Sequence, residues 1–380
     1  MAIKKAKIIL VVISIVISAC VALLAYNVSE QVDDGFKSTA AYYDMIIGPA
    51  GSSTQLAMNT MFFTEKPLGT ISYEHVENLQ KDMRINKVVP FTMGDSYNSA
   101  KIVGTTADFL EGKSLNKGEM FTNSFEAVIG SGVAERYDLK IGSTLITSHG
   151  LSEGGHAHES TPLTVVGILS ETTTAYDNVI FTSVKTVWAT HDHGAHEEHE
   201  EHEEHGEICA ILVKTKSFNY YNQIKTEYGK DGSLLVINPA EVIREVMQNV
   251  DLSAKIVYIL CIIILIMNIF IISVITLLNM YDSKKEISLM RLIGIGMNKI
   301  NLLYIIQNSI IGLISTLLAF LGSRACLALM GEFVASMGIV LDSSRLYSAE
   351  IGIMAVVFVI SILPTVVCTL SMSRKDGLSE

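Results

Sequence analysis

The sequence predicts an α-helical membrane domain with four transmembrane helices, plus an α+β extracytoplasmic domain between the first and second helices. Three observations predict this fold class. The chain of 380 residues is 49% hydrophobic. It contains four apolar runs long enough to cross a bilayer. The polar stretch 27–253 separates the first of these runs from the second.

The four apolar runs are the predicted transmembrane spans. At a rise of about 1.5 Å per residue, each can cross a hydrocarbon core of about 30 Å. The predicted spans are residues 8–26, 254–280, 302–322 and 350–370. Apart from Lys255 and Glu350 at two span ends, these runs contain no charged residue. Ion pathways usually need such groups or polar cavities, so the spans offer a cation no obvious route.

The basic residues near the spans predict the orientation of the chain. They precede the first span (Lys4, Lys5, Lys7), join the second to the third (Lys284, Lys285, Arg291, Lys299) and follow the fourth (Arg374, Lys375). Because basic flanks stay inside, we expect both termini and the loop 281–301 in the cytoplasm. The segment 27–253 then lies outside the cell (inner or cytoplasmic) membrane.

A cleaved signal is the alternative interpretation of the first span. The stretch Ile17-Ser18-Ala19-Cys20 resembles a lipoprotein cleavage box. The apolar run continues through Val21–Tyr26, where a lipoprotein normally becomes polar, so an uncleaved helix is favoured.

The outer segment 27–253 is acidic, with 32 acidic and 16 basic side chains. Such a surface disfavours nucleic acid and anionic lipid and permits cations or cationic peptides. Its single cysteine, Cys209, cannot form a disulfide within the domain. The domain must therefore fold on its own core, for which its length suffices.

Alternating apolar residues and turn signals predict mixed α and β structure in the outer segment. The expected strands are 100–103, 127–129, 163–169, 178–181, 208–213 and 234–237. The expected helices are 132–137, 218–228, 239–250 leading into the second span, and one that Ser72 caps and that ends before Lys87. We expect the first span to continue outward as a helix as far as Gly48, and 48–53 to be a loop.

Motifs for nucleotide hydrolysis are absent from the sequence. The stretch Glu111-Gly112-Lys113-Ser114 suggests a phosphate loop, but Ala107 occupies the place of the required first glycine. Neither a G-x-S-x-G nor an H-E-x-x-H motif occurs. The chain is therefore not expected to be an enzyme, and any ATP that drives it must be hydrolysed by a separate polypeptide.

The loop 281–301 carries the most specific pattern in the sequence. Ile287, Leu289, Met290, Ile293 and Ile295 give it an apolar face at helical spacing. Its charged residues lie on other faces. A short amphipathic helix of this kind lies at the membrane surface or inserts into a groove on a partner.

The same loop resembles the signature of permeases of the MacB/FtsX type. The shared pattern is a basic stretch, Glu286-Ile287, apolar residues, Arg291, two further apolar residues and Gly294. The tail 373–378 is similar to the end of that family, with Gly377 in place of the family's proline. In the outer segment, 101–112, 126–134 and 163–169 resemble a MacB-like periplasmic core domain.

The resemblance implies the permease subunit of an ABC transporter, with an FtsX-like domain over 254–380. A separate cytoplasmic ATPase would bind the coupling helix 281–301 through Lys285, Glu286, Leu289, Arg291 and Gly294. It also implies a homodimer or heterodimer of permeases, no required cofactor, and relay of motion to the outer domain. The family acts on lipoproteins, peptides, antibiotics or toxins, or regulates cell-wall hydrolases.

The stretch 191–207 holds six of the ten histidines and eight acidic residues. The candidate ligands for Zn²⁺ or another divalent transition metal are His191, His193, His196, His199, His202 and His205, with His156 and His158 in a separate, smaller low-complexity stretch, 152–160. A spacing of three drifts about 60° per step on a helix, so a flexible segment suits the pattern better. The alternative is a solvated acidic linker.

Two functional hypotheses follow. The first is a transporter subunit, either in zinc or divalent-metal handling or in lipoprotein, peptide or antibiotic export. The second is a non-transporting device for mechanotransmission or metal sensing that controls an extracytoplasmic partner. A metal-binding partner outside the membrane would favour transport of metal. Another extracytoplasmic partner, such as a peptidoglycan hydrolase, would favour the non-transporting device.

Overall fold

The computed structural model describes residues 2–40, 42–149, 161–192, 206–230, 232–335 and 340–376. The chain forms two compact units. One contains Met1–Gln31, Val250–Met330 and Asp342–Glu380, and the other contains Val32–Asn249 and Gly331–Leu341. The α+β unit is therefore inserted into the helical unit after the first helix, which confirms the predicted fold class.

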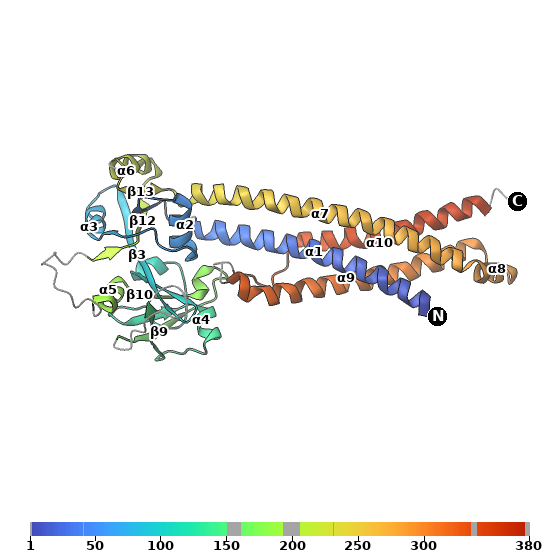
Figure 1. Ribbon diagram of the computed structural model, residues 1–380, viewed down its shortest axis with the longest axis horizontal. Helices are drawn as coiled ribbons and strands as arrows, with labels where there is room; N and C mark the ends of the chain where they lie inside the picture. The colour runs from blue at the N-terminus through green and yellow to red at the C-terminus, as the bar shows by residue number, and fades with distance from the viewer. Residues whose placement is uncertain are drawn as a thin grey trace. The chain divides into compact units, whose positions relative to one another are not determined.

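Four long helices build the helical unit (Figure 1). They are α1 (Ala2–Ala40), α7 (Pro239–Asp282), α9 (Met297–Ala335) and α10 (Ser348–Asp376), and the short α8 (Lys284–Leu292) lies between α7 and α9. Each long helix contains a segment apolar enough to cross a membrane: Lys7–Phe36, Lys255–Asn279, Met297–Gly331 and Ser348–Val367. All four predicted spans are thus confirmed as helices, although α9 extends well beyond residue 322.

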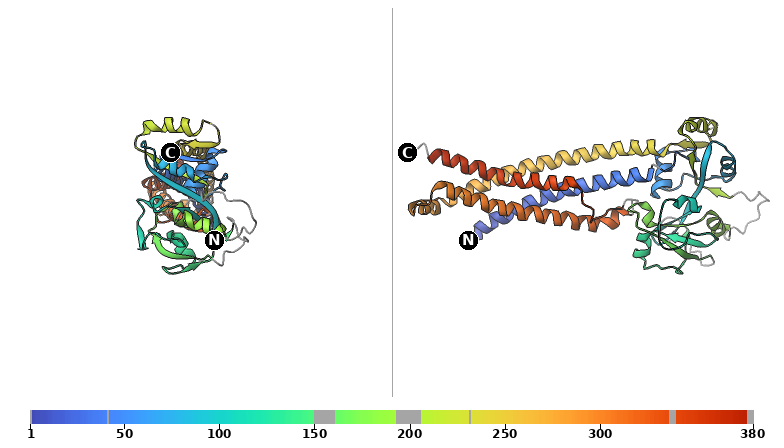
Figure 2. Two further views of the ribbon diagram at one scale, coloured as in Figure 1. Left: turned by 90° about the vertical axis from the view of Figure 1, so that its left-hand side faces the viewer. Right: turned by 180° about the vertical axis from the view of Figure 1, so that it is seen from behind.

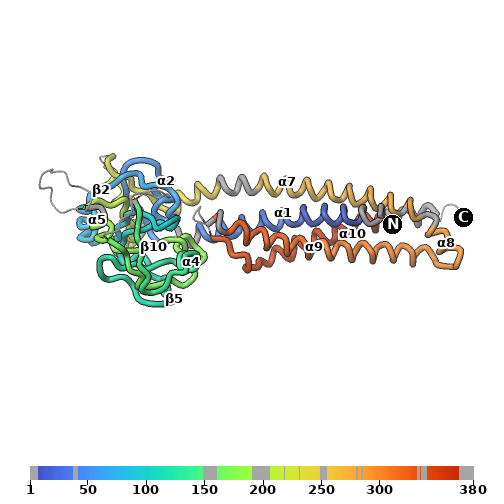
Figure 3. The backbone as a smooth tube through the Cα atoms, turned by 60° about the horizontal axis from the view of Figure 1, so that its bottom comes forward, coloured from blue at the N-terminus to red at the C-terminus, as the bar shows by residue number. Residues whose placement is uncertain are grey.

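Small and branched apolar side chains join the four helices. Ile15 and Ala19 of α1 pack with Ile272 of α7, Ala319 of α9 and Val357 of α10. Figure 3 shows α1, α9 and α10 running side by side. Large apolar side chains elsewhere on the helices are exposed, for example Ile256 at 61% and Ile351 at 73%. An apolar exterior of this kind is expected of helices surrounded by lipid.

A single large sheet organises the α+β unit, in the order β13-β1-β12-β3-β4-β10-β6-β9-β5, with β7 on β9 and β8 on β3. Its strands are β1 (Met45–Pro49), β3 (Ile85–Tyr97), β4 (Ala100–Thr105), β5 (Leu115–Gly118), β6 (Glu126–Ile129), β7 (Thr144–Leu145), β8 (Ser148–His149), β9 (Leu163–Leu169), β10 (Val179–Ser183), β12 (Ala210–Thr215) and β13 (Leu234–Ile237). A separate ribbon pairs β2 (Ile71–Ser72) with β11 (Glu207–Ile208).

The long strand β3 belongs to both halves of this sheet, and its course can be followed in Figure 2. Its first part, to Phe91, pairs with β12, and its second part, from Thr92, pairs with β4. Each half has its own apolar core. The aromatic rings of Phe63, Phe91, Phe109 and Phe181 pack against one another. The centroids of the Phe63 and Phe91 rings, for example, are 6.2 Å apart.

Short helices cover the sheet: α2 (Ser53–Phe62), α3 (Glu74–Gln80), α4 (Ser131–Arg136), α5 (Val184–Asp192) and α6 (Tyr221–Tyr228). Most predicted strands and helices are present with small shifts at their ends. The N-cap residue of α3 is Tyr73 and not Ser72, although the Ser72 hydroxyl accepts a 3.2 Å hydrogen bond from the Glu74 N–H.

Two predictions for the outer segment are wrong. The helix that follows the first span ends at Ala40 and not near Gly48, because Met45–Pro49 form β1 between β12 and β13. The segment 48–53 is consequently not a loop throughout, since α2 begins at Ser53 with the Ser52 hydroxyl accepting from the Gln55 N–H.

Candidate functional site

The predicted coupling helix is present as α8, but it is shorter than the range 281–301. It covers Lys284–Leu292 and ends in a Schellman turn. The Ile295 N–H donates to the Met290 carbonyl and the Gly294 N–H to the Arg291 carbonyl, both at 3.0 Å. Gly294 adopts a φ of 88°, which glycine tolerates without strain. The turn lets α9 start afresh at Met297.

The apolar residues of α8 face two environments. Ile287 is 8% exposed, whereas Leu289, Leu292 and Ile293 are 63%, 82% and 77% exposed. Glu286 and Arg291 are also exposed, and both make polar contacts within the chain. Lys285 lies in the first turn of α8. Three neighbouring large apolar side chains are therefore exposed around the end of α8.

A cavity of about 160 Å³ lies beside α8 within the helical unit. Glu286 and Met290 of α8 line it together with Asn279 of α7 and Gln307 and Asn308 of α9. The amide of Asn308 also donates a 2.6 Å hydrogen bond to the Thr365 hydroxyl of α10. Asn308 therefore joins α9 to α10, in agreement with the way polar groups usually join helices in membranes.

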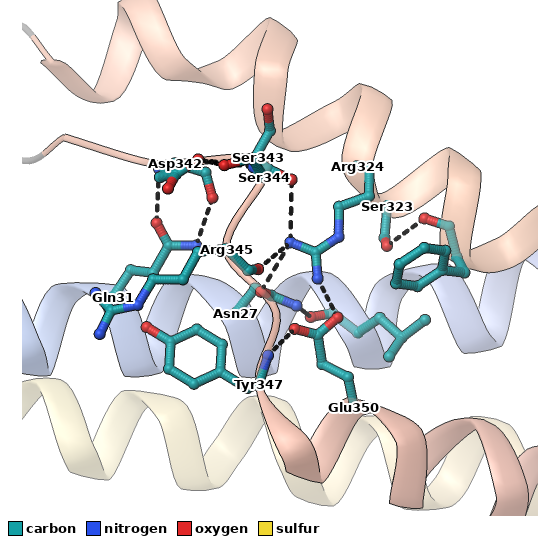
Figure 4. Close-up of polar contacts among 12 residues, drawn as sticks. Asn27, Gln31, Ser323, Arg324, Asp342, Ser343, Ser344, Arg345, Tyr347 and Glu350 are labelled. Carbon is teal, nitrogen blue, oxygen red and sulfur yellow. Dashed lines mark hydrogen bonds and ion pairs between the residues drawn. The ribbon is translucent and has the colours of Figure 1, made fainter. Parts of the chain in front are cut away.

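A polar cluster centred on Arg324 connects three helices of the helical unit (Figure 4). The Arg324 guanidinium pairs with the carboxylate of Glu350, which is 1% exposed. It also donates to the Arg345 carbonyl at 2.7 Å and the Ser343 carbonyl at 3.2 Å, and to Asn27 Oδ1 at 3.4 Å. Arg324 belongs to α9, Asn27 to α1 and Glu350 to α10.

The partners of Arg324 are themselves held in place. Glu350 Oε1 accepts a 2.9 Å hydrogen bond from the Tyr347 N–H at the start of α10, an arrangement that caps the helix. The Asn27 side chain is fully buried, and its amide donates to the Leu23 carbonyl at 2.9 Å, which turns Oδ1 toward the guanidinium. The ion pair is thus surrounded by oriented hydrogen-bond partners.

A second bridge joins the same loop to α1, one turn from Asn27. Gln31 Nε2 donates to the Asp342 carbonyl at 3.1 Å, and the Asp342 N–H returns a 2.7 Å bond to Gln31 Oε1. The N–H and hydroxyl of Ser344 donate to the Asp342 carboxylate and hold the pKa of that group below its ordinary value.

The cluster around Arg324 was missed by the sequence analysis, in which the third predicted span ended at residue 322. In the structure α9 continues to Ala335, so Arg324 is a helical residue inside the candidate span Met297–Gly331. The available signal was an arginine and a glutamate near the facing ends of consecutive spans, because charged groups at such positions usually pair.

The histidine candidates lie almost entirely outside the described residues. This applies to His193, His196, His199, His202 and His205, and to His156 and His158. His191 is the penultimate residue of α5. Among the residues that the structure describes, no group of three or more His, Cys, Asp or Glu side chains could hold a metal ion.

The described residues that precede the two histidine-bearing segments lie next to Asp95, which is buried. His149 is the register partner of Asp95 across the β3–β8 ladder, immediately before residues 150–160. On the other side, the Thr190 hydroxyl lies 3.5 Å from Asp95 Oδ2, and His191 follows Thr190. Residue 149 of β8 and Thr190 of α5, distant in sequence, therefore both lie next to Asp95 of β3.

Comparison with protein families identifies the class of protein that this fold defines. Residues 8–227 match the MacB-like periplasmic core domain, and residues 257–376 match the FtsX-like permease C-terminal domain. The chain belongs to the MacB/FtsX family of ABC transporter permeases. It is a multi-pass membrane protein, and in this family the permease is not the ATP-hydrolysing unit.

Solved structures include similar outer domains. The periplasmic region of MacB from Actinobacillus actinomycetemcomitans is 13% identical, with 57% of this chain and 97% of that chain covered and a TM-score of 0.38. The extracellular domain of the noncanonic ABC-type transporter YknZ from Gram-positive bacteria is 14% identical, with coverages of 51% and 99% and a TM-score of 0.33. Comparison with curated proteins gave no match.

Proposed function

We propose that this chain is a permease subunit that relays the ATP-driven motion of a separate cytoplasmic ATPase to its outer domain. The observation that carries the proposal is the exposed apolar surface formed by Leu289, Leu292 and Ile293 around the end of α8. Apolar anchors on a short helix suit insertion into a groove of a partner protein. Basic flanking residues support an orientation with α8 and both termini in the cytoplasm.

Continuous helices support the transmission of motion. Helix α1 continues to Ala40, and near that end Phe36 packs on Phe62 with ring centroids 4.4 Å apart. Helix α7 begins in the α+β unit, where Val242 and Ile243 are buried, and continues to Asp282 without a break. An unbroken helix transmits displacement along its axis. A dimer of permeases, as in the related family, would bring two such helix pairs together.

Loss of the apolar surface of α8 tests the relay. The triple substitution of Leu289, Leu292 and Ile293 by Ser should abolish co-purification of the ATPase and the stimulation of its turnover by the permease. The matched control is Met83→Ser, which removes an apolar side chain that is 86% exposed in the α+β unit. Replacing Glu286 or Arg291 should weaken coupling in the same assay. Full stimulation in the triple variant would refute this role of α8.

We further propose that the histidine-bearing segments bind a divalent transition metal such as Zn²⁺. The supporting observation is that residues 149 and 190, which precede the two histidine-bearing segments in the chain, both lie next to Asp95. Imidazole and carboxylate are suitable ligands for this class of ion. Because imidazoles protonate near pH 6, binding should weaken as the pH falls toward that value.

Calorimetric titration of the full chain with ZnCl₂ tests metal binding. Deletion of 193–204 should remove most of the bound zinc, whereas His75→Ala, in α3, should bind like the unmodified chain. Equal zinc binding by the deletion variant would contradict the assignment. Growth under zinc limitation then separates two roles. If the chain transports metal, cells should need the segment to grow under zinc limitation. If it is a sensing device or exports lipoproteins, peptides or antibiotics, they should not.

A further inference from the structure

We propose that Arg324 is a positioning residue that fastens the α9–α10 connection to α1, so that movement of α9 and α10 carries α1 with it. The inference deepens the relay proposed above, because it names the contact through which motion entering at α8 reaches α1. The polar cluster of Figure 4 is the physical basis of the fastening.

The guanidinium of Arg324 is suited to this task by its geometry. It offers several N–H donors in one plane, and here it reaches acceptors on three separate parts of the chain. These are Asn27 in α1, the carbonyls of Ser343 and Arg345 in the loop, and Glu350 in α10. A lysine has a single nitrogen and could not satisfy this arrangement.

Helix α1 is bonded to different helices near its start and further along. Lys7 pairs with Asp282 at 2.7 Å, which ties the beginning of α1 to the end of α7 next to α8. Arg324 holds the same helix at Asn27, and Asp342 holds it at Gln31 one turn further along. From Met297, where α9 begins, to Arg324 is about 40 Å along the helix axis. A displacement at the start of α9 can therefore act on α1 at the far end of the bundle.

Polar contacts are the feature that prevents slippage between these helices. The apolar packing of Ile15 and Ala19 with α9 and α10 is non-directional, so it tolerates small sliding movements. The hydrogen bonds of Arg324 and of Gln31 fix one register between α1 and the loop, because they weaken steeply with misalignment. The cluster thus specifies which residues of α1 face the α9–α10 connection.

Removal of one partner alone would leave a buried charge without its counterion, which is strongly destabilising. The informative variant is therefore the pair Arg324→Met and Glu350→Met. It replaces the ion pair by apolar groups that a membrane-spanning bundle accommodates, while it removes the link to Asn27 and to the loop carbonyls. Arg345→Ala is the matched control, since Arg324 uses only the backbone carbonyl of Arg345.

The native cysteines supply the measurement. Cys20 of α1 and Cys326 of α9 are free thiols that face each other. In membranes containing the full chain, copper phenanthroline should link them rapidly, and Cys20→Ser should abolish the product. In the double-Met variant the link should form about tenfold more slowly, as expected for loss of a charge-assisted hydrogen bond. Arg345→Ala should link at the unmodified rate.

This measurement needs no ATPase, so it decides the inference independently of the relay. Unchanged cross-linking in the double-Met variant would overturn the role of Arg324. A second arm uses the complex with the partner ATPase. There the double-Met variant should lose the nucleotide-dependent change in Trp188 fluorescence. Formation of the disulfide between Cys20 and Cys326 should restore that change. If the unmodified chain shows no such change, the relay fails while the cross-linking result stands.

Discussion

The indole Nε1–H of Trp188 donates a 2.8 Å hydrogen bond to the backbone carbonyl of Glu207. The contact ties α5, which precedes residues 193–205, to β11, which follows them. The neighbouring Gly206 carbonyl accepts a 3.1 Å bond from the Tyr73 N–H, and the Tyr73 ring meets the indole edge-on at 5.1 Å. Both ends of the histidine-rich stretch are thereby fixed to the same part of the α+β unit.

Gly206→Val should destabilise the α+β unit by about 1–3 kcal/mol, the usual cost of forcing extra atoms into a packed site. A Cβ at this position would overlap the Trp188 ring. Chemical unfolding followed by fluorescence of Trp188, the single tryptophan of the chain, measures the loss. The control is Gly94→Ala, where a Cβ meets nothing within 4 Å. Equal stability of the two variants would contradict the packing described.

Gly312→Leu should loosen the contact between α9 and α10. A Cβ at Gly312 would collide with the Ser361 side chain of α10, so the helices would have to move apart. We expect a loss in stability of about 1–3 kcal/mol. On heating, a thiol dye should therefore react with the span cysteines at a lower temperature than in the unmodified chain. Gly352→Leu, in open space on α10, should leave that transition unchanged or raise it.

Tyr43→Phe should leave the α+β unit as stable as before or stabilise it by about 1 kcal/mol. The Tyr43 hydroxyl is buried and lacks a hydrogen-bond partner within the residues described, and burial raises its pKa far above the ordinary value. The paired control is Tyr42→Phe, which removes a 2.6 Å bond to Glu111 and should not stabilise. Denaturant midpoints followed by Trp188 fluorescence compare the two, and a clear loss in Tyr43→Phe would be unexpected.

Glu126 should give the α+β unit an acid-dependent contribution to stability. Its carboxylate accepts bonds from the side chain and N–H of Asn123 and from the N–H of Thr122, which lower its pKa to about 2. A carboxyl group whose pKa is lower in the folded than in the unfolded state stabilises the fold at pH values above its unfolded pKa, near 4.5. This contribution is lost as the pH falls toward 2. The stability gap between the unmodified chain and Glu126→Gln should close over that interval. A gap that stays constant with pH would rule out the carboxylate as its source.

The sequence was sufficient for the spans and most strands, because hydropathy and alternation report burial directly. It was insufficient where proline sits inside a strand. Pro49 ends β1, and Pro90 lies in β3 opposite Ile211, so both segments contain a residue that normally disfavours sheet. Their strand character comes from pairing with β12 and β13, which are more than a hundred residues away in sequence.

The polar cluster around Arg324 could not be predicted for a related reason. In the sequence, Ser323 and Arg324 resemble the start of a loop. In the structure, the Ser323 hydroxyl donates to the Phe320 carbonyl within α9, and Arg324 forms an ion pair with Glu350. The helix continues because each polar group has a partner that only the folded bundle supplies. The end of α8 was predictable in principle, since Gly294 is the residue that a left-handed helix terminus favours.

Strand β3 has a consequence for cooperativity. Because Ile85–Phe91 complete one half of the sheet and Thr92–Tyr97 the other, neither half can lose this strand without exposing an open edge on its neighbour. The two halves should therefore melt together in one transition. The amide protons of β3 should be among the last to exchange with solvent, and a single disruptive residue near Phe91 should dissolve both cores at once.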